Sequence, residues 1–267
     1  MTDALLEEWG PHDVLTLTLD RPERRNALDP ELLGALAEAL HRDGERAGAV
    51  ILRGAGDDAF SAGYDLSKLT GTIEDLDADR HIGDAVNALR HCPAPVIARL
   101  AGHCHGAGVE LALNCDLRVA TPTLRLSVPA VSLGVVYRFQ FVARLVQTCG
   151  IARTADLLLA MPELDGEAAH GWGLVTEVVP IAQVDDRVRE LAEKLATSPR
   201  QAVHGTKASL NLLERRAIAG EDLLQAQQLR AAAAASPERQ EALRRRRDRV
   251  RRPRPDPPRQ ARRGTKR

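Results

Sequence analysis

The sequence has no apolar run long enough to span a membrane, and its first eight residues are acidic and lack the basic region of a secretory signal. Cysteine is scarce, and the few that occur lie far apart, without the close pairs that metal sites use. These are Cys92, Cys104, Cys115 and Cys149. Isolated cysteines in a chain without an export signal are typical of reduced core positions. We therefore expect a cytoplasmic protein without disulfides that binds no membrane.

Nucleotide-binding motifs are also missing. No GxGxxG run follows a strand in the required context, and no P-loop occurs, which argues against a nucleotide cofactor. The run His103-Cys104-His105 invites a metal interpretation, but adjacent side chains diverge, and no carboxylate or cysteine pair completes a ligand set in the sequence. The sequence therefore predicts no metal site.

The formal net charge of zero hides two parts of opposite sign. Residues 244–267 hold twelve Arg and one Lys against Asp248 and Asp256, which leaves 24 basic and 35 acidic residues in the rest of the chain. This tail is rich in proline and nearly devoid of apolar residues, so it cannot bury enough surface to fold alone. We expect a disordered tail that binds polyanions only nonspecifically, because it has no aromatic side chains on which bases could stack.

Alternating strand and helix patterns in the first 120 residues predict a layered α/β fold. The expected strands are Val14–Leu19, Ala49–Leu52, Ile97–Leu100 and Leu117–Ala120, with a helix over Glu31–His41 that starts behind Asp29-Pro30. The rest of the chain is mostly helical in pattern. The expected helices are Phe139–Cys149, Ile151–Ala160, Gln183–Ala196, Pro199–Leu213 and Glu221–Ala235.

Two small-residue turns after strand-like runs are the most informative feature. The first lies in the segment from Ala59 to Leu66 (AFSAGYDL), and the second opens the segment from Gly106 to Leu111 (GAGVEL). Each can aim a peptide N–H into a shared pocket, and the second stands at a helix start, where N–H groups lack intrahelical partners. Two converging N–H donors form an oxyanion hole, which indicates chemistry on a thioester or ester.

At these motifs the chain resembles the crotonase (enoyl-CoA hydratase/isomerase) superfamily, from about Val14 to about Leu243. Four further blocks occur in the family's order: RPERRNAL from Arg21, PVIA with AG from Pro95, CDLRVA from Cys115 and HGWGLV from His170. The resemblance implies a crotonase-type ββα spiral core over residues 1–198. It also implies a helical trimerisation region over 199–243, and hence a homotrimer or a dimer of trimers.

The resemblance also implies a site for an acyl-CoA substrate, with no cofactor beyond its CoA moiety. The oxyanion donors would be the N–H groups of Tyr64 and Ala107, and Glu110 would match the first of two glutamates that bracket a water in hydratases. Ala130 stands where the second glutamate is expected, which weakens ordinary hydration chemistry. The segments that contact CoA in the family place Arg24, Arg25, Ala27, Ala62, Asp65, Leu66 and Lys68 at the CoA moiety.

The Gly134-Val-Val-Tyr137 pattern, with FSAGYD, resembles the methylmalonyl-CoA decarboxylase branch, in which a tyrosine hydroxyl holds the departing carboxylate. Tyr137 is the candidate for that role, and a core tyrosine is an equally good interpretation. The sequence therefore predicts a lyase that decarboxylates a (methyl)malonyl-CoA-type thioester. The alternatives are enoyl-CoA hydration or isomerisation by Glu110 alone, and a non-enzymatic member that binds polyanions.

Overall fold

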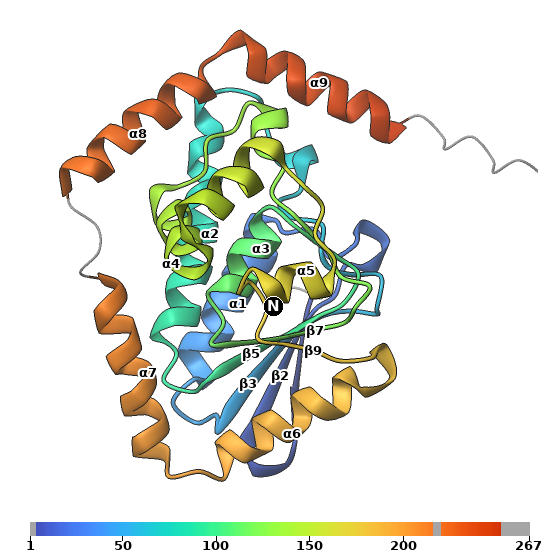
Figure 1. The fold of residues 1–267 in the computed structure, drawn as a ribbon, viewed down its shortest axis with the longest axis vertical. Coiled ribbons are helices and arrows are strands. Elements are labelled where there is room, and N and C mark those ends of the chain that lie inside the picture. The colour runs from blue at the N-terminus through green and yellow to red at the C-terminus, as the bar shows by residue number, and fades with distance from the viewer. Residues whose placement is uncertain (1–3, 216–219, 252–267) are drawn as a thin grey trace, which may run out of the picture.

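The structure, a computed structural model, describes residues 4–215 and 220–251, which form two sheets enclosed by helices (Figure 1). One sheet has the strand order β1-β2-β3-β5-β7-β9 and the other the order β4-β6-β8. All neighbouring strands are parallel except β1, which runs antiparallel to β2. The strands are β1 Leu5–Trp9, β2 Val14–Leu19, β3 Ala49–Gly54, β4 Ala59–Ser61, β5 Val96–Leu100, β6 His103–His105, β7 Leu117–Ala120, β8 Arg125–Ser127 and β9 Glu177–Val178.

The helices follow the expected order closely. They are α1 Pro30–Asp43, α2 Ala78–His91, α3 Ala107–Leu113, α4 Phe139–Ala155, α5 Gly166–Gly171, α6 Val184–Ala196, α7 Arg200–Arg215, α8 Gly220–Ala234 and α9 Pro237–Arg251. Asp29 caps α1 by accepting a hydrogen bond from the Leu32 N–H at 2.9 Å, as its position before Pro30 predicts. Gly150, with φ of 80°, kinks α4 where two helices were expected to meet. The predicted α/β class is confirmed.

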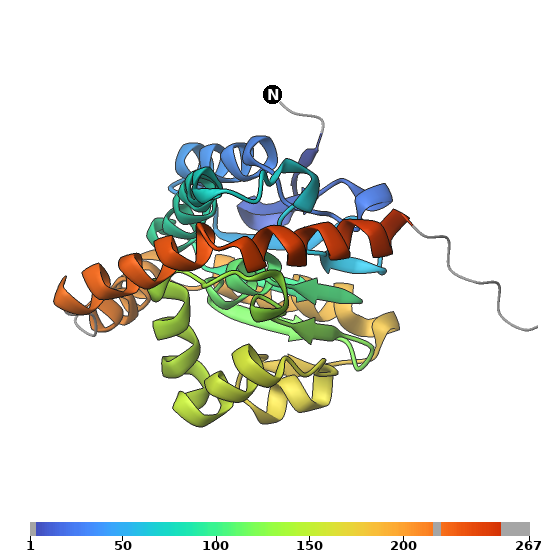
Figure 2. The same cartoon turned by 90° about the horizontal axis from the view of Figure 1, so that it is seen from above.

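The larger sheet is covered by helices on both faces. Alternate residues of its strands therefore pack into different layers. In β3, Val50 and Leu52 belong to the main core, which also includes residues of α1 and α2. Ala49 and Ile51 pack on the other side in a smaller cluster with Val188 of α6. Figure 1 shows α6 below the sheet and α1, α2 and α3 above it, and Figure 2 shows the same layers from above. No helix within the described residues combines the length and apolar character that crossing a bilayer requires.

The elements that were not expected from the sequence include β1, β8, β9, α2, α5 and α9. Strand β1 is an edge strand in which only Leu5 is buried, so it lacks a strong alternating pattern. Helix α2 does bury residues at helical spacing, Ile82, Val86 and Leu89 among them, and this signal was available in the sequence.

Helix α9 corrects the prediction of a disordered tail for residues 244–251, which are helical. The helix docks just before these residues, where Leu243 is buried, and within them the Arg247 side chain donates to the carbonyl groups of Leu66 and Leu69. Contacts to the folded body, which composition alone cannot reveal, therefore order this arginine-rich segment. Residues 252–267 lie outside the described residues.

Lys207 attaches α7 to the body of the protein. Its ammonium group is buried, donates to the carbonyl oxygens of Leu89 at 3.1 Å and Ala94 at 3.0 Å, and pairs with Asp116 at 2.8 Å. This one side chain therefore connects α7 to the end of α2, to the loop before β5 and to the start of β7.

We predict that Lys207→Met lowers the free energy of unfolding by about 2–4 kcal/mol. The substitution removes the donor to two buried carbonyl groups and the cationic partner of Asp116, which keeps its hydrogen bond from the Val96 N–H. Chemical denaturation followed by circular dichroism measures the effect. Lys194→Met, at an exposed position of α6, is the matched control and should change stability by less than about 0.5 kcal/mol. Equal stabilities for the two variants would contradict the proposed attachment.

Candidate functional site

The described residues line a cavity of about 400 Å³ at the N-terminal end of α3. Residues of α8 and α9 also line this cavity. Its walls come from the turn after β4, the start of α3, the loop after β8 and the two C-terminal helices. Apolar side chains such as Leu66, Ile82 and Leu133 make up part of the wall. The polar lining comprises Tyr64, Asp75, Asp79, His105, Glu110, Ser127, Ser132, Tyr137, Glu163, Arg230, Arg239 and Arg246.

Glycine allows the two predicted turns to touch. Gly63 has φ of 90°, and a Cβ there would lie 2.7 Å from the carbonyl oxygen of His105 and 3.6 Å from the Ala107 nitrogen. In the described part of the chain, the N–H groups of Tyr64 and Ala107 have no hydrogen-bond partner, and both residues line the cavity. The structure thus brings together the two donors that the sequence predicts for an oxyanion hole.

Glu110 lies in the first turn of α3, where it is 2% exposed and lines the cavity. The Arg138 guanidinium forms an ion pair and a hydrogen bond with its carboxylate. Burial raises the pKa of Glu110, and the charge and hydrogen bond of Arg138 oppose this rise. A carboxyl group with a raised pKa at the wall of a cavity is a candidate for general acid–base catalysis.

Tyr137 packs edge-on against Phe141, with ring centroids 4.9 Å apart. Its hydroxyl lies at the turn before α3, since a Cβ on Gly106 would come within 2.8 Å of it. Among the described residues, the hydroxyl has no hydrogen-bond partner. Burial and the nearby Glu110 raise the pKa of Tyr137, so the phenol is neutral. Ala130 is buried at the cavity, and no carboxylate occupies its position.

Of the seven residues expected at the CoA moiety, two line the cavity and five do not. Ala62 and Leu66 line the cavity. Asp65 instead forms ion pairs with Arg21 at 3.2 Å and Arg24 at 2.9 Å, and accepts hydrogen bonds from Ser67. The other three lie outside the lining: Arg25 and Lys68 are exposed and Ala27 is buried. Binding of CoA by these residues stays a prediction.

Sequence reasoning missed the contribution of α8 and α9 to the cavity wall. Arg239 of α9 is 4% exposed and pairs with the buried Asp75 at 2.7 Å, and Arg230 of α8 pairs with Asp79. These partners stand more than 150 residues apart in the chain. The charges were visible in the sequence, but no local pattern links an arginine near the C-terminus to an aspartate near residue 75. The pairing of Arg138, which directly follows Tyr137, with Glu110 was also missed.

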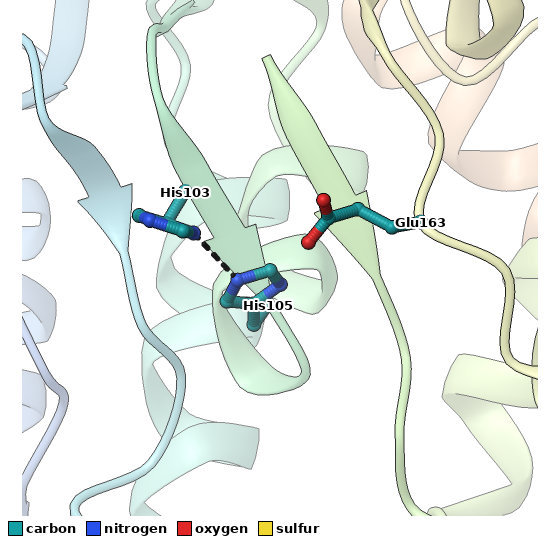
Figure 3. Close-up of side chains that lie close together, drawn as sticks. All are labelled: His103, His105 and Glu163. Carbon is teal, nitrogen blue, oxygen red and sulfur yellow. Dashed lines mark hydrogen bonds between the residues drawn. The ribbon is translucent and has the colours of Figure 1, made fainter. Parts of the chain in front are cut away.

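Contrary to the sequence-based prediction, a carboxylate does join the two histidines of β6. His103 and His105 stand two residues apart in β6, so their side chains share one face of the strand, and Glu163 lies beside them (Figure 3). The potential ligand atoms of the three side chains lie within 4.8 Å of one another. The sequence could not show this because Glu163 is about sixty positions away from the histidines.

Comparison with known proteins shows the family of the chain. A family model described as enoyl-CoA hydratase/isomerase matches residues 10–248, and the chain belongs to this family, the crotonase superfamily. The chain is 34% identical to the 1,2-epoxyphenylacetyl-CoA isomerase of Escherichia coli over 75% of this chain and 79% of that protein. It is 30% identical to the short-chain-enoyl-CoA hydratase of Clostridium acetobutylicum over 79% of this chain and 82% of that protein.

Among solved structures, a methylmalonyl-CoA decarboxylase in complex with 2-nitronate-propionyl-CoA aligns with a TM-score of 0.87 and 21% identity. The alignment covers 93% of this chain and 97% of that chain. At this identity the likeness shows the fold alone, and it confirms the crotonase fold.

We predict that Arg138→Met raises the pKa of Glu110, because it removes the positive charge and the hydrogen bond that favour the carboxylate while burial remains. The pKa is measured from the carboxyl carbon signal of Glu110 in an NMR titration. Arg153→Met, at an exposed position of α4, is the control and should leave that signal unchanged. A pKa that stays constant or falls in Arg138→Met would contradict the electrostatic role of the pair.

Proposed function

We propose that this protein moves a proton within an enoyl-CoA thioester, as an isomerase or hydratase with Glu110 as its one proton-transferring carboxylate. The observation that carries the proposal is the position of Glu110. It is a buried carboxyl with a raised pKa, in the first turn of the helix whose opening N–H faces the same cavity.

Isomerisation requires only one such group. The Glu110 carboxylate removes a proton from the α-carbon of a β,γ-unsaturated thioester, and the electron pair spreads over the dienolate and its oxygen. The N–H groups of Tyr64 and Ala107 stabilise the negative charge on that oxygen. The carboxylic acid formed at Glu110 returns the proton to the γ-carbon, which leaves the double bond conjugated and the carboxylate restored.

Ala130 favours this reaction over two-carboxylate hydration. Addition of water needs one group to deprotonate the water and a proton source for the α-carbon. A methyl side chain at position 130 can do neither, so Glu110 would have to serve both steps in turn. The names of the two relatives, a 1,2-epoxyphenylacetyl-CoA isomerase and a short-chain-enoyl-CoA hydratase, support an isomerase or hydratase that acts on a CoA thioester.

Decarboxylation of a malonyl-CoA-type thioester is the second candidate, favoured by the Tyr137 hydroxyl at Gly106. There the bond between the α-carbon and the carboxylate breaks, carbon dioxide leaves, and the electron pair forms the enolate held by the same two N–H groups. The Tyr137 hydroxyl would donate to the carboxylate before it leaves. The named relatives give more support to the hydratase and isomerase reactions than to this one.

A cytoplasmic homotrimer or dimer of trimers also stays a prediction. The helices that the family resemblance assigns to trimer formation carry exposed leucines on α7 and α8, which a neighbouring protomer could cover. These are Leu210, Leu212, Leu224 and Leu229.

We predict that Ala107→Pro lowers kcat by about a hundredfold or more, the loss found when a single oxyanion donor is removed. Proline is tolerated at the first position of a helix, so the substitution removes the N–H without breaking α3. Ala107→Gly, which keeps the N–H, is the matched control and should retain most of the activity. If a folded Ala107→Pro protein keeps the wild-type kcat, this N–H is not an oxyanion donor.

A second prediction separates proton transfer from decarboxylation. Isomerisation of a β,γ-enoyl-CoA is followed by the absorbance of the conjugated thioester that it forms, because the mass does not change. Hydration of crotonyl-CoA and loss of carbon dioxide from methylmalonyl-CoA are followed by mass spectrometry. Glu110→Gln should reduce isomerisation or hydration by about 100- to 10,000-fold, because the amide cannot accept the proton. Tyr137→Phe should change these rates little, and Glu167→Gln, at an exposed position of α5, should not change them.

Release of carbon dioxide from methylmalonyl-CoA, slowed about ten- to a hundredfold by Tyr137→Phe, would instead establish the decarboxylase reaction. Proton transfer that persists in Glu110→Gln would overturn the proposed function.

A further inference from the structure

A second group of side chains at the cavity has the composition of a metal centre. His103 and His105 extend from the same face of β6, and the Glu163 carboxylate turns toward His105 from across the neighbouring strand (Figure 3). Cys104, between the two histidines, is fully buried on the opposite face of the strand and takes no part. Of the three, His105 and Glu163 line the cavity.

The backbone holds this group together. Strands β6 and β8 pair in parallel, with His105 opposite Ser127. Leu126 of β8 exchanges two backbone hydrogen bonds of 2.8 Å with Leu164, which fixes the chain at Glu163 against the small sheet. The carboxylate is therefore brought to the histidines by the fold, although its side chain is exposed and joins from a loop.

The hydrogen bonds of His105 orient its ring, with one nitrogen toward Ser127 and the other toward His103. Its Nδ1 lies 2.8 Å from the Ser127 hydroxyl, and its Nε2 lies 2.9 Å from Nδ1 of His103. When Nδ1–H donates to Ser127, the lone pair of Nε2 faces His103, in the arrangement by which metal-binding histidines are oriented. Two ring nitrogens this close share one proton in the absence of an ion, and a metal ion can replace that proton.

The charges around the group oppose the binding of a cation. Arg25, Arg125 and Arg246 all place positive charge close enough to act on His105. The same arginines repel a cation, and Arg125 lies 4.0 Å from the Glu163 carboxylate. Bound at this position, a divalent ion would therefore have a moderate affinity.

We propose that His103 Nδ1, His105 Nε2 and the Glu163 carboxylate bind one divalent first-row transition metal ion, with Zn²⁺ as the best fit, at the wall of the cavity. Two imidazoles and one carboxylate are a common ligand set of zinc sites that keep one position open for water. Zn–N bonds of 2.0–2.1 Å at tetrahedral angles place the nitrogens about 3.3–3.4 Å apart, so the two rings need to separate only slightly. Ser127 is the positioning residue for His105.

The test uses the untagged full-length protein and does not depend on its activity. Equilibrium dialysis against Zn²⁺ with elemental analysis gives the stoichiometry and Kd, and the visible absorption of the Co²⁺ form reports ligand geometry. We expect one ion per chain and a tetrahedral Co²⁺ spectrum. His103→Gln, His105→Gln and Glu163→Gln should each raise Kd at least tenfold, and Ser127→Ala should raise it about tenfold through the orientation of His105.

His41→Gln, which removes an exposed histidine of α1, is the control and should leave Kd unchanged. Absence of a stoichiometric Zn²⁺ or Co²⁺ complex in the wild-type protein overturns the proposal, whatever the variants do. An octahedral Co²⁺ spectrum, or a Kd that the three ligand substitutions leave unchanged, overturns it as well. The cluster would then be a hydrogen-bonded histidine pair that shares one proton.

Discussion

The close approach of two backbone turns is the constraint on which the cavity depends. Gly63 fits directly against the carbonyl of His105, and any side chain at that position would force the turn after β4 away from the start of α3. The N–H groups of Tyr64 and Ala107 face one cavity only while the turns touch. The same contact determines the position of Glu110, one turn into α3, relative to those donors.

The buried ion pair between Glu110 and Arg138 determines the acid–base properties of the carboxyl group at the cavity. Every residue of α3 is buried, so an isolated Glu110 carboxylate would be costly and would hold its proton tightly. Arg138, at the start of α4, supplies the countercharge. Burial raises the pKa of this carboxyl group and the countercharge opposes that rise, so the ion pair determines how readily Glu110 gives up a proton.

Local sequence patterns predicted most of the fold and the two turns that meet at the cavity. Strand β2 was predicted with its observed ends, and Asp29, Gly63, Gly106 and Glu110 could be placed because their roles depend on neighbours a few residues away. The Asp75–Arg239 pair and the approach of Glu163 to His105 depend on contacts between distant segments, and no spacing rule reports them. Helix α9 escaped prediction for the same reason, because its order comes from docking.

Arg239 also has a consequence for the order in which the protein can be completed during synthesis. Asp75 is buried and charged, and its only arginine partner among the described residues is translated 164 positions later. Until α9 has left the ribosome, the nascent chain therefore carries a cavity with one wall missing and an unneutralised carboxylate in it. The earlier segments can fold and form the sheets, but a cavity that encloses a ligand exists only after the last described helix has been made.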